Sequence, residues 1–256
     1  MDDRTPSKMD ADTDPGETLD PFYRGRVRLF QPKRGYRFAL DAPLLADFIR
    51  TDADDDILEL GTGNGVIPVL LSLKPFRRIT AVEIQPSLFD LARRNVALNG
   101  LESRVEIVAA DFRGYRPGRR FDIVFSNPPY VKKGTGFPSP SEEKSVAKQE
   151  ITCDIYEVMN TTAELLKPEG RAYFVFPAAR LGDLVGAARA RGLHPSLLRF
   201  VHPRRGDPAN LFLSEFGVGE TPARTIDPLF LYGADGEQTP ETRAICEGRS
   251  RGPAFP

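Results

Sequence analysis

Four consecutive residues, Asn127-Pro128-Pro129-Tyr130, carry the clearest potential for chemistry. An –NH2 group can donate its two hydrogens to two oxygens of this segment, the side-chain oxygen of Asn127 and the carbonyl of Pro128. The ring of Tyr130 can lie on the face of the conjugated group that bears the amine. Two acceptors placed outside the amine plane favour a pyramidal nitrogen and restore its lone pair. The segment is therefore suited to hold a planar amine as a nucleophile; the alternative is a rigid loop with a buried tyrosine.

The residues before this segment explain how it is held in place. Residues 121–126 form an apolar run with a β-branched pair, which predicts a buried strand. The two prolines cannot continue a strand because they lack the N–H that a sheet requires. Asn127 precedes a proline and is therefore kept out of helical angles. The sequence thus predicts a stiff, extended turn at the end of a buried strand.

Three further polar segments follow predicted strands. The strand over 57–60 leads into the glycine loop Gly61–Gly65, the strand over 79–84 carries Glu83 near its end, and the strand over 105–110 leads to Asp111. A glycine loop that enters a helix exposes backbone N–H groups to a ligand, and an acid at a strand end can accept both hydrogens of a ribose diol. Asp111 is suitably placed for an adenine amine. In a parallel sheet all these strand ends meet at one edge, which predicts a shared ligand site.

The remaining pattern alternates strands and helices. We expect helices over 42–50, 65–73, 86–99 and 180–191 and through Tyr156 to Leu166, and strands over 172–176, 197–201 and 211–216. Asp41 is expected to cap the first of these helices, with a contact to a cofactor as the second interpretation. The alternation predicts an α/β fold with a mostly parallel sheet covered by helices on both faces.

Charge is unevenly distributed in a chain of 256 residues with a net charge of −1. Residues 22–37 contain six basic side chains and no acid, and residues 171–205 contain seven arginines and one acid. Segregated basic segments indicate contact with a polyanion. The two cysteines lack metal-binding spacing, which argues against a zinc site and fits the cytoplasm. No apolar run is long enough to cross a membrane.

Three segments are expected to lie outside the core. The acidic residues 1–20 and the Gly-, Pro- and Arg-rich residues 233–256 are expected to be disordered tails, which leaves a domain over 21–232 with a basic N-terminal segment. The loop 131–150 is long for a compact domain and is expected to be a lid or binding loop. The sequence leaves the oligomeric state open.

Taken together, these motifs resemble those of class I S-adenosylmethionine-dependent methyltransferases that modify exocyclic or amide nitrogens. The segment 31–41 narrows the resemblance to the tRNA(Val) adenine-N6 methyltransferase family. That resemblance implies S-adenosylmethionine as cofactor, a tRNA partner, no metal, and a Rossmann-like sheet of seven strands whose last strand is antiparallel.

The resemblance also implies roles for individual residues. Glu83 would hold the cofactor's ribose and Asp111 its adenine amine, and Asn127 to Tyr130 would hold the target amine. The other residues implied in the cofactor site are Glu59, Gly61, Gly63, Asn64, Gly65, Phe112 and Asn127. The basic side chains expected to contact RNA are Arg28, Lys33, Arg34, Arg37, Arg204 and Arg205.

Other activities share parts of this pattern. A glutamine-N5 protein methyltransferase or a guanine-N2 RNA methyltransferase would use the same Asn127 loop. A DNA adenine methyltransferase usually needs a recognition domain for which this chain has no room. A nicotinamide-dependent oxidoreductase fits the glycine loop and Glu83 but not residues 127–130. A non-catalytic RNA-binding module explains the arginines but not the strand-end residues.

Overall fold

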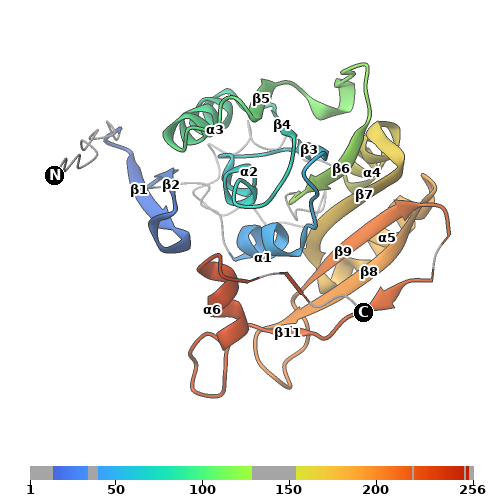
Figure 1. Ribbon diagram of the computed structural model, residues 1–256. Coiled ribbons are helices and arrows are strands. Elements are labelled where there is room, and N and C mark those ends of the chain that lie inside the picture. The colour runs from blue at the N-terminus through green and yellow to red at the C-terminus, as the bar shows by residue number, and fades with distance from the viewer. Residues whose placement is uncertain (1–13, 34–39, 129–153, 221, 251, 254–256) are drawn as a thin grey trace, which may run out of the picture.

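The computed structural model describes residues 14–33, 40–128, 154–220, 222–250 and 252–253. Strands and helices alternate through most of this range (Figure 1). The strands are β1 (Glu17–Phe22), β2 (Val27–Pro32), β3 (Asp56–Leu60), β4 (Arg78–Glu83), β5 (Val105–Ala109), β6 (Phe121–Ser126), β7 (Leu166–Pro177), β8 (Leu193–His202), β9 (Leu211–Val218), β10 (Arg224–Thr225) and β11 (Leu229–Phe230). The helices are α1 (Asp41–Phe48), α2 (Val66–Leu71), α3 (Pro86–Leu98), α4 (Ile155–Leu165), α5 (Leu181–Arg189) and α6 (Pro240–Cys246), with short 3-10 turns η1 (Tyr23–Gly25), η2 (Phe112–Gly114) and η5 (Ala178–Arg180).

Seven long strands form the central sheet in the order β5-β4-β3-β6-β7-β9-β8. Neighbours from β5 to β7 pair in parallel, and β9 runs antiparallel to both β7 and β8. The two-residue strands β10 and β11 extend the sheet beyond β8. The expected α/β fold, including seven main strands with the last one antiparallel, is confirmed.

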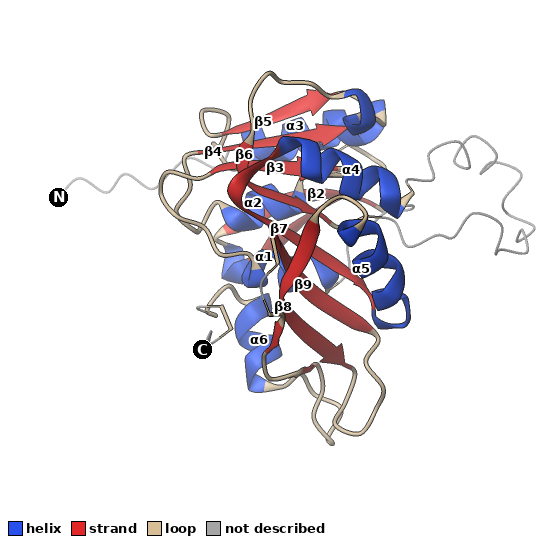
Figure 2. Cartoon of the chain, turned by 90° about the vertical axis from the view of Figure 1, so that its right-hand side faces the viewer, coloured by secondary structure: helices blue, strands red, loops and turns tan. Residues whose placement is uncertain are grey.

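Helices cover both faces of this sheet (Figure 2). Alternate residues of β6 point to opposite faces: Ile123 and Phe125 join the core under α1 and α2, whereas Val124 joins the core under α4 and α5. This alternation follows from the two-residue period of a strand. The sheet is therefore buried on both sides, and its strand ends are the places where polar side chains can act.

The first helix is shorter than expected. Helix α1 ends at Phe48 rather than residue 50, and the ammonium group of Lys74 donates to the carbonyls of Ala46, Asp47 and Ile49 at 2.7–2.8 Å. These carbonyls lie at a helix end, where they have no partner further along the helix. A lysine from another part of the chain thus satisfies the end of α1.

Both ends of the chain contain structure where the sequence predicted disorder. Residues 17–22 form β1, which pairs antiparallel with β2, and Glu17 accepts two hydrogen bonds from Arg94 of α3 at 2.8 and 2.9 Å. Residues 240–246 form α6, and its Ile245 is buried in the core beside α1. Neither segment is apolar enough for its sequence alone to predict that it packs against the core. Residues far along the chain supply the contacts that hold each of them.

Candidate active site at the carboxyl edge of the sheet

The described half of the Asn-Pro-Pro-Tyr segment lies directly after β6. Asn127 is half-buried and Pro128 is buried. The hydroxyl of the preceding Ser126 donates to the carbonyl of Leu60 at 2.7 Å, which fixes the end of β6 against the end of β3. The predicted juxtaposition of Asn127 with the glycine loop after Leu60 is therefore present. Pro129, Tyr130 and the expected lid over 131–150 lie outside the described residues, as do Arg34 and Arg37.

Asp41 contacts Asn127 directly. The amide Nδ2 of Asn127 donates to Oδ2 of Asp41 at 3.0 Å, and Oδ1 of Asp41 accepts from the backbone N–H of Ala42 at 2.9 Å. The expected N-cap position belongs to Leu40, and Asp41 is the first residue of α1. The carboxylate thus interacts with the start of the helix, as expected, but also with a residue 86 positions away, which the sequence did not reveal.

The glycine loop connects β3 to α2 through three residues with positive φ. Gly61, Gly63 and Gly65 have φ of 75°, 60° and 76°. A Cβ on Gly65 would lie 3.1 Å from Cβ of Ala92 in α3, so this position requires glycine for space as well as for conformation. Among the described residues, a Cβ on Gly61 would meet nothing within 4 Å, so these residues leave the outer side of the loop open. Space for a ligand therefore lies over Gly61.

Glu83 holds the glycine loop from the neighbouring strand. Its Oε2 accepts from the N–H of Gly63 at 2.8 Å, and its Oε1 accepts from the N–H of Gln85 at 2.9 Å. Burial raises the pKa of Glu83, and these backbone N–H groups partly offset the rise. A carboxylate offers about four acceptor positions, so these backbone N–H groups do not occupy all of them. Glu83 consequently organises the loop and can also bind a diol.

Buried polar groups lie beneath the glycine loop. Burial raises the pKa of Glu59 to about 8, so its carboxyl group holds a proton at neutral pH. Among the described residues, Oε2 of Glu59 and both amide atoms of Asn64 have no hydrogen-bond partner although they are buried. Buried polar groups normally have partners. These atoms are therefore the groups that a polar ligand at the loop would satisfy.

Asn95 is a site residue that the sequence patterns did not single out. It is fully buried in α3, and its Nδ2 donates to the carbonyls of Asn64 and Phe30 at 2.8 and 3.1 Å. Its Oδ1 accepts from the N–H of Phe30 at 2.7 Å. One side chain thus ties the glycine loop to strand β2. The available signal was an asparagine beside Ala92 and Val96 on the apolar side of a predicted helix.

Asp111 is near the predicted edge, but Arg113 already binds its carboxylate. The guanidinium of Arg113 donates to both oxygens of Asp111 at 2.6–2.9 Å, and this pair holds the pKa of Asp111 below its usual range. Strand β5 ends at Ala109, two residues before Asp111. The neighbouring Phe112 is half-buried against the core on the α4 side. An adenine amine at Asp111 would therefore share this carboxylate with Arg113.

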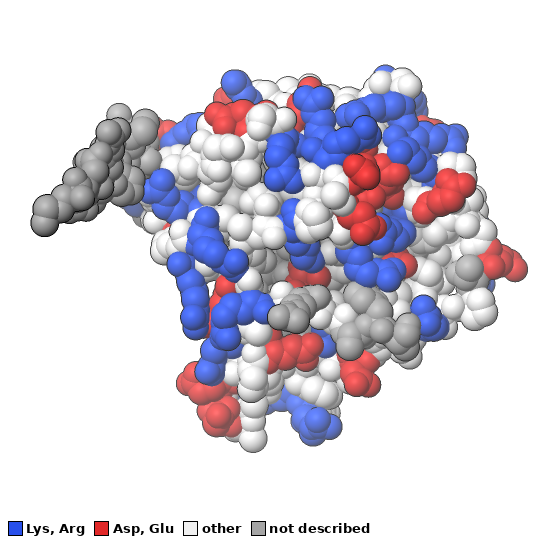
Figure 3. Space-filling view, viewed as in Figure 1, with Lys and Arg blue, Asp and Glu red and all other residues white. Residues whose placement is uncertain are grey.

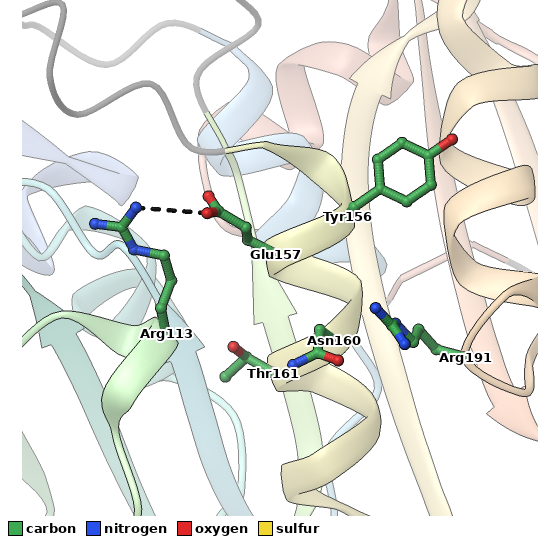
Figure 4. Close-up of a pocket in the computed structure, with 6 residues that line it drawn as sticks. All are labelled: Arg113, Tyr156, Glu157, Asn160, Thr161 and Arg191. Carbon is green, nitrogen blue, oxygen red and sulfur yellow. Dashed lines mark hydrogen bonds and ion pairs between the residues drawn. The ribbon is translucent and has the colours of Figure 1, made fainter.

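An open cavity of about 300 Å³ adjoins Arg113 (Figure 4). Its wall comes from α4, η2 and the turn after α5. Arg113 pairs with Glu157 on one side of α4, whereas the half-exposed ring of Tyr156 points to the other side, toward α5. The lining residues are Arg113, Tyr156, Glu157, Asn160, Thr161 and Arg191.

The described basic residues differ in how accessible they are. Arg204 and Arg205 are exposed in the turn between β8 and β9, where their guanidinium groups lie over the rings of Tyr232 and Phe230. Because β8 runs parallel to β7, this turn lies at the same sheet edge as Asn127. Arg199, on strand β8 before this turn, is instead buried and pairs with Glu241.

The N-terminal basic residues lie on strand β2 and just beyond it. Arg28 is exposed, and Lys33 donates to the carbonyl of Pro15 at 2.9 Å. On the face shown in Figure 3, Lys and Arg side chains are interspersed with acidic ones. In the described parts of the chain no group of three or more His, Cys, Asp or Glu side chains could hold a metal ion, and no helix is long and apolar enough to span a membrane.

The sequence and structure match known methyltransferases. Two curated relatives, from Phocaeicola vulgatus and Porphyromonas gingivalis strain W83, are each described as a tRNA1(Val) (adenine(37)-N6)-methyltransferase. They are 28% and 29% identical to this chain, over 73% and 82% of it and 79% and 87% of their own lengths. A crystal structure from Agrobacterium tumefaciens, of a predicted O-methyltransferase, has the same fold, with a TM-score of 0.63 and 21% identity over 82% of this chain and 97% of that one.

The family assignment comes from residues 40–179, which match the sequence model of the methyltransferase small domain. This range runs from the residue before Asp41 to just beyond the end of β7 and includes the glycine loop, Glu83, Asp111 and Asn127. It covers more than half of the 256 residues. The chain therefore belongs to the methyltransferase small domain family, and the expectation of a methyltransferase is confirmed.

Proposed function

We propose that this protein transfers a methyl group from S-adenosylmethionine to the exocyclic N6 amine of an adenosine in tRNA. One observation carries the proposal: an asparagine amide, oriented by a carboxylate, stands at the sheet edge beside an open glycine loop. The names of the curated relatives support adenosine 37 of tRNA1(Val) as the target. A tRNA substrate is consistent with the expected cytoplasmic location of this protein.

The residues at the edge fit the proposed cofactor. Glu83 has acceptor positions left for a ribose diol, Gly61 leaves open space above the loop, and the partnerless atoms of Glu59 and Asn64 suit the polar methionine end. Asp111 is assigned to the adenine amine, and Phe112 to a ring contact. When bound, the cofactor supplies an electrophilic methyl group on a positively charged sulfur.

Asn127 and Pro128 act on the nucleophile. The side-chain oxygen of Asn127 and the carbonyl of Pro128 accept the two hydrogens of the target amine and direct its lone pair toward the methyl group. As the amine nitrogen gains positive charge, the same two oxygens stabilise it more strongly than they stabilise the neutral amine. The methylated amine is then acidic enough to lose a proton to water, so no strong base is required.

RNA must deliver an unstacked base to this edge. Tyr130 is assigned to stack on the target base, which offsets about 1–3 kcal/mol of lost stacking. Exposed Arg204 and Arg205 at the same edge are assigned to phosphate groups, together with Arg28 and Lys33. Arg34 and Arg37 share this assignment on sequence grounds.

Methyl transfer to defined RNA tests the proposal. The protein is incubated with methyl-labelled S-adenosylmethionine and an unmodified tRNA1(Val) transcript, and the product nucleoside is identified. We expect N6-methyladenosine from this transcript and none from a matched transcript with guanosine at position 37. Asn127→Ala should abolish turnover and leave the cofactor dissociation constant almost unchanged. N2-methylguanosine in the transcript would instead identify the guanine-N2 activity. Label in protein glutamine, when total protein replaces the transcript as substrate, would identify the glutamine-N5 activity.

A further inference from the structure

The hydrogen bond between Asp41 and Asn127 has a defined direction. A carboxylate can only accept hydrogen bonds, so the amide group that faces Asp41 at 3.0 Å is the –NH2 group. The side-chain oxygen of Asn127 consequently lies on the opposite side of the amide carbon. An asparagine amide has nearly the same shape in both orientations, so a partner with fixed polarity must select one.

Asp41 is itself held in place. Its second oxygen accepts from the N–H of Ala42 in the first turn of α1, a helix whose residues after Asp41 are all buried. The carboxylate therefore bridges a fixed helix and the turn after β6. Its charge also polarises the amide of Asn127 and strengthens the amide oxygen as an acceptor.

We propose that Asp41 is a positioning residue for methyl transfer, which keeps the amide oxygen of Asn127 turned toward the target amine. This inference rests on the proposed function, because it assumes that Asn127 accepts a hydrogen from the target. Asp41 touches neither the substrate nor the cofactor in this scheme. It acts by excluding the orientation in which Asn127 would present –NH2, a donor, to another donor.

Asp41→Asn tests the direction of this hydrogen bond. The new side chain keeps an oxygen for Ala42 but places an –NH2 group opposite the –NH2 group of Asn127. Two donors cannot bond, so the amide of Asn127 turns over and presents its nitrogen to the target amine. We expect kcat with the tRNA1(Val) transcript to fall on the order of 10- to 100-fold, the effect of one hydrogen bond to a charged group. The melting temperature and the dissociation constant for S-adenosylhomocysteine should stay at the wild-type values.

A second substitution provides a rescue that a merely structural role would not give. In the double variant Asp41→Asn/Asn127→Asp, the amide at position 41 donates to the carboxylate at position 127. The other carboxylate oxygen then faces the target amine as an acceptor. We expect the double variant to have a higher kcat than Asp41→Asn alone.

The outcomes separate this inference from the proposed function. If Asn127→Ala keeps full activity, the proposed role of Asn127 is wrong, whatever Asp41 does. If Asn127→Ala is inactive but Asp41→Asn keeps the wild-type kcat, the positioning role is refuted. A fall in both kcat and melting temperature in Asp41→Asn, without recovery in the double variant, also refutes it, because Asp41 would then only support the helix.

Discussion

Replacing Gly61 with alanine allows two effects to be measured separately: the steric effect of a Cβ on ligand binding and the effect of positive φ on fold stability. Gly61 has a φ of 75°, and its Cβ would project into the open space over the glycine loop. Gly118, in the turn before β6, is also exposed, has a φ of 70° and has no described residue within 4 Å of its Cβ position. The two positions therefore impose the same backbone cost on alanine, and we propose that only Gly61 borders the cofactor.

The similar φ and surroundings of Gly61 and Gly118 set the expected changes in melting temperature and in the dissociation constant. An alanine in the left-handed region costs roughly 1–2 kcal/mol, so Gly61→Ala and Gly118→Ala should each lower the melting temperature by about 2–8 °C. A methyl group that overlaps a bound ligand costs about 1–3 kcal/mol more, which corresponds to about 5- to 150-fold in the dissociation constant. This second effect should appear only in Gly61→Ala.

Thermal unfolding without ligand and calorimetric titration with S-adenosylmethionine measure the two effects separately. Gly65→Ala supplies a third comparison, because its Cβ would lie 3.1 Å from Cβ of Ala92 and should destabilise the fold by about 1–3 kcal/mol beyond the backbone cost. If Gly61→Ala and Gly118→Ala bind the cofactor equally well, the glycine loop does not border it, and the assignment of Gly61–Gly65 fails.

Three further predictions concern charge. Because burial raises the pKa of Glu59 from 4.5 to about 8, its protonation stabilises the folded state fully below about pH 4.5, and this contribution is lost as pH rises through 8. The melting temperature of the wild type should therefore fall more steeply between pH 5 and pH 8 than that of Glu59→Gln; parallel curves would contradict the raised pKa. Replacing both Arg204 and Arg205 with alanine should reduce the slope of log K against log salt for tRNA binding by about 0.7–0.9 for each phosphate that the two arginines neutralise in the wild type. If the salt slope is unchanged when both Arg204 and Arg205 are replaced, the proposed RNA contact of this turn is wrong. Arg199→Ala should instead lower the melting temperature, since Arg199 is buried against Glu241.

Local sequence patterns were sufficient for the sheet and for the convergence of its polar ends. Apolar runs of strand length between amphipathic helices allow few arrangements other than a parallel sheet, and the carboxyl ends of parallel strands must share one edge. The sequence therefore predicts that Glu83, Asn127 and Gly61–Gly65 lie together. The structure adds that Gly61, Gly63 and Gly65 all have positive φ, a conformation that glycine adopts without steric cost.

Contacts between residues far apart in the sequence determined the end of α1 and the positions of β1 and α6. The early end of α1 depends on Lys74, which takes the terminal carbonyls of the helix. Strand β1 is held by Arg94, and α6 packs beside α1 through Ile245. Composition reports only whether a segment could fold on its own, so it cannot detect stabilisation by partners elsewhere in the chain.

The amide of Asn127 also depends partly on local sequence and partly on tertiary contacts. The sequence alone determined that Asn127 stands after a buried strand, held in a stiff turn by the prolines that follow. Only the tertiary structure decided which way its amide faces, because that depends on Asp41, a carboxylate 86 residues earlier in the chain. Periodicity and turn chemistry act over a few residues, whereas hydrogen-bond direction between two side chains is set by the packing of the elements that carry them.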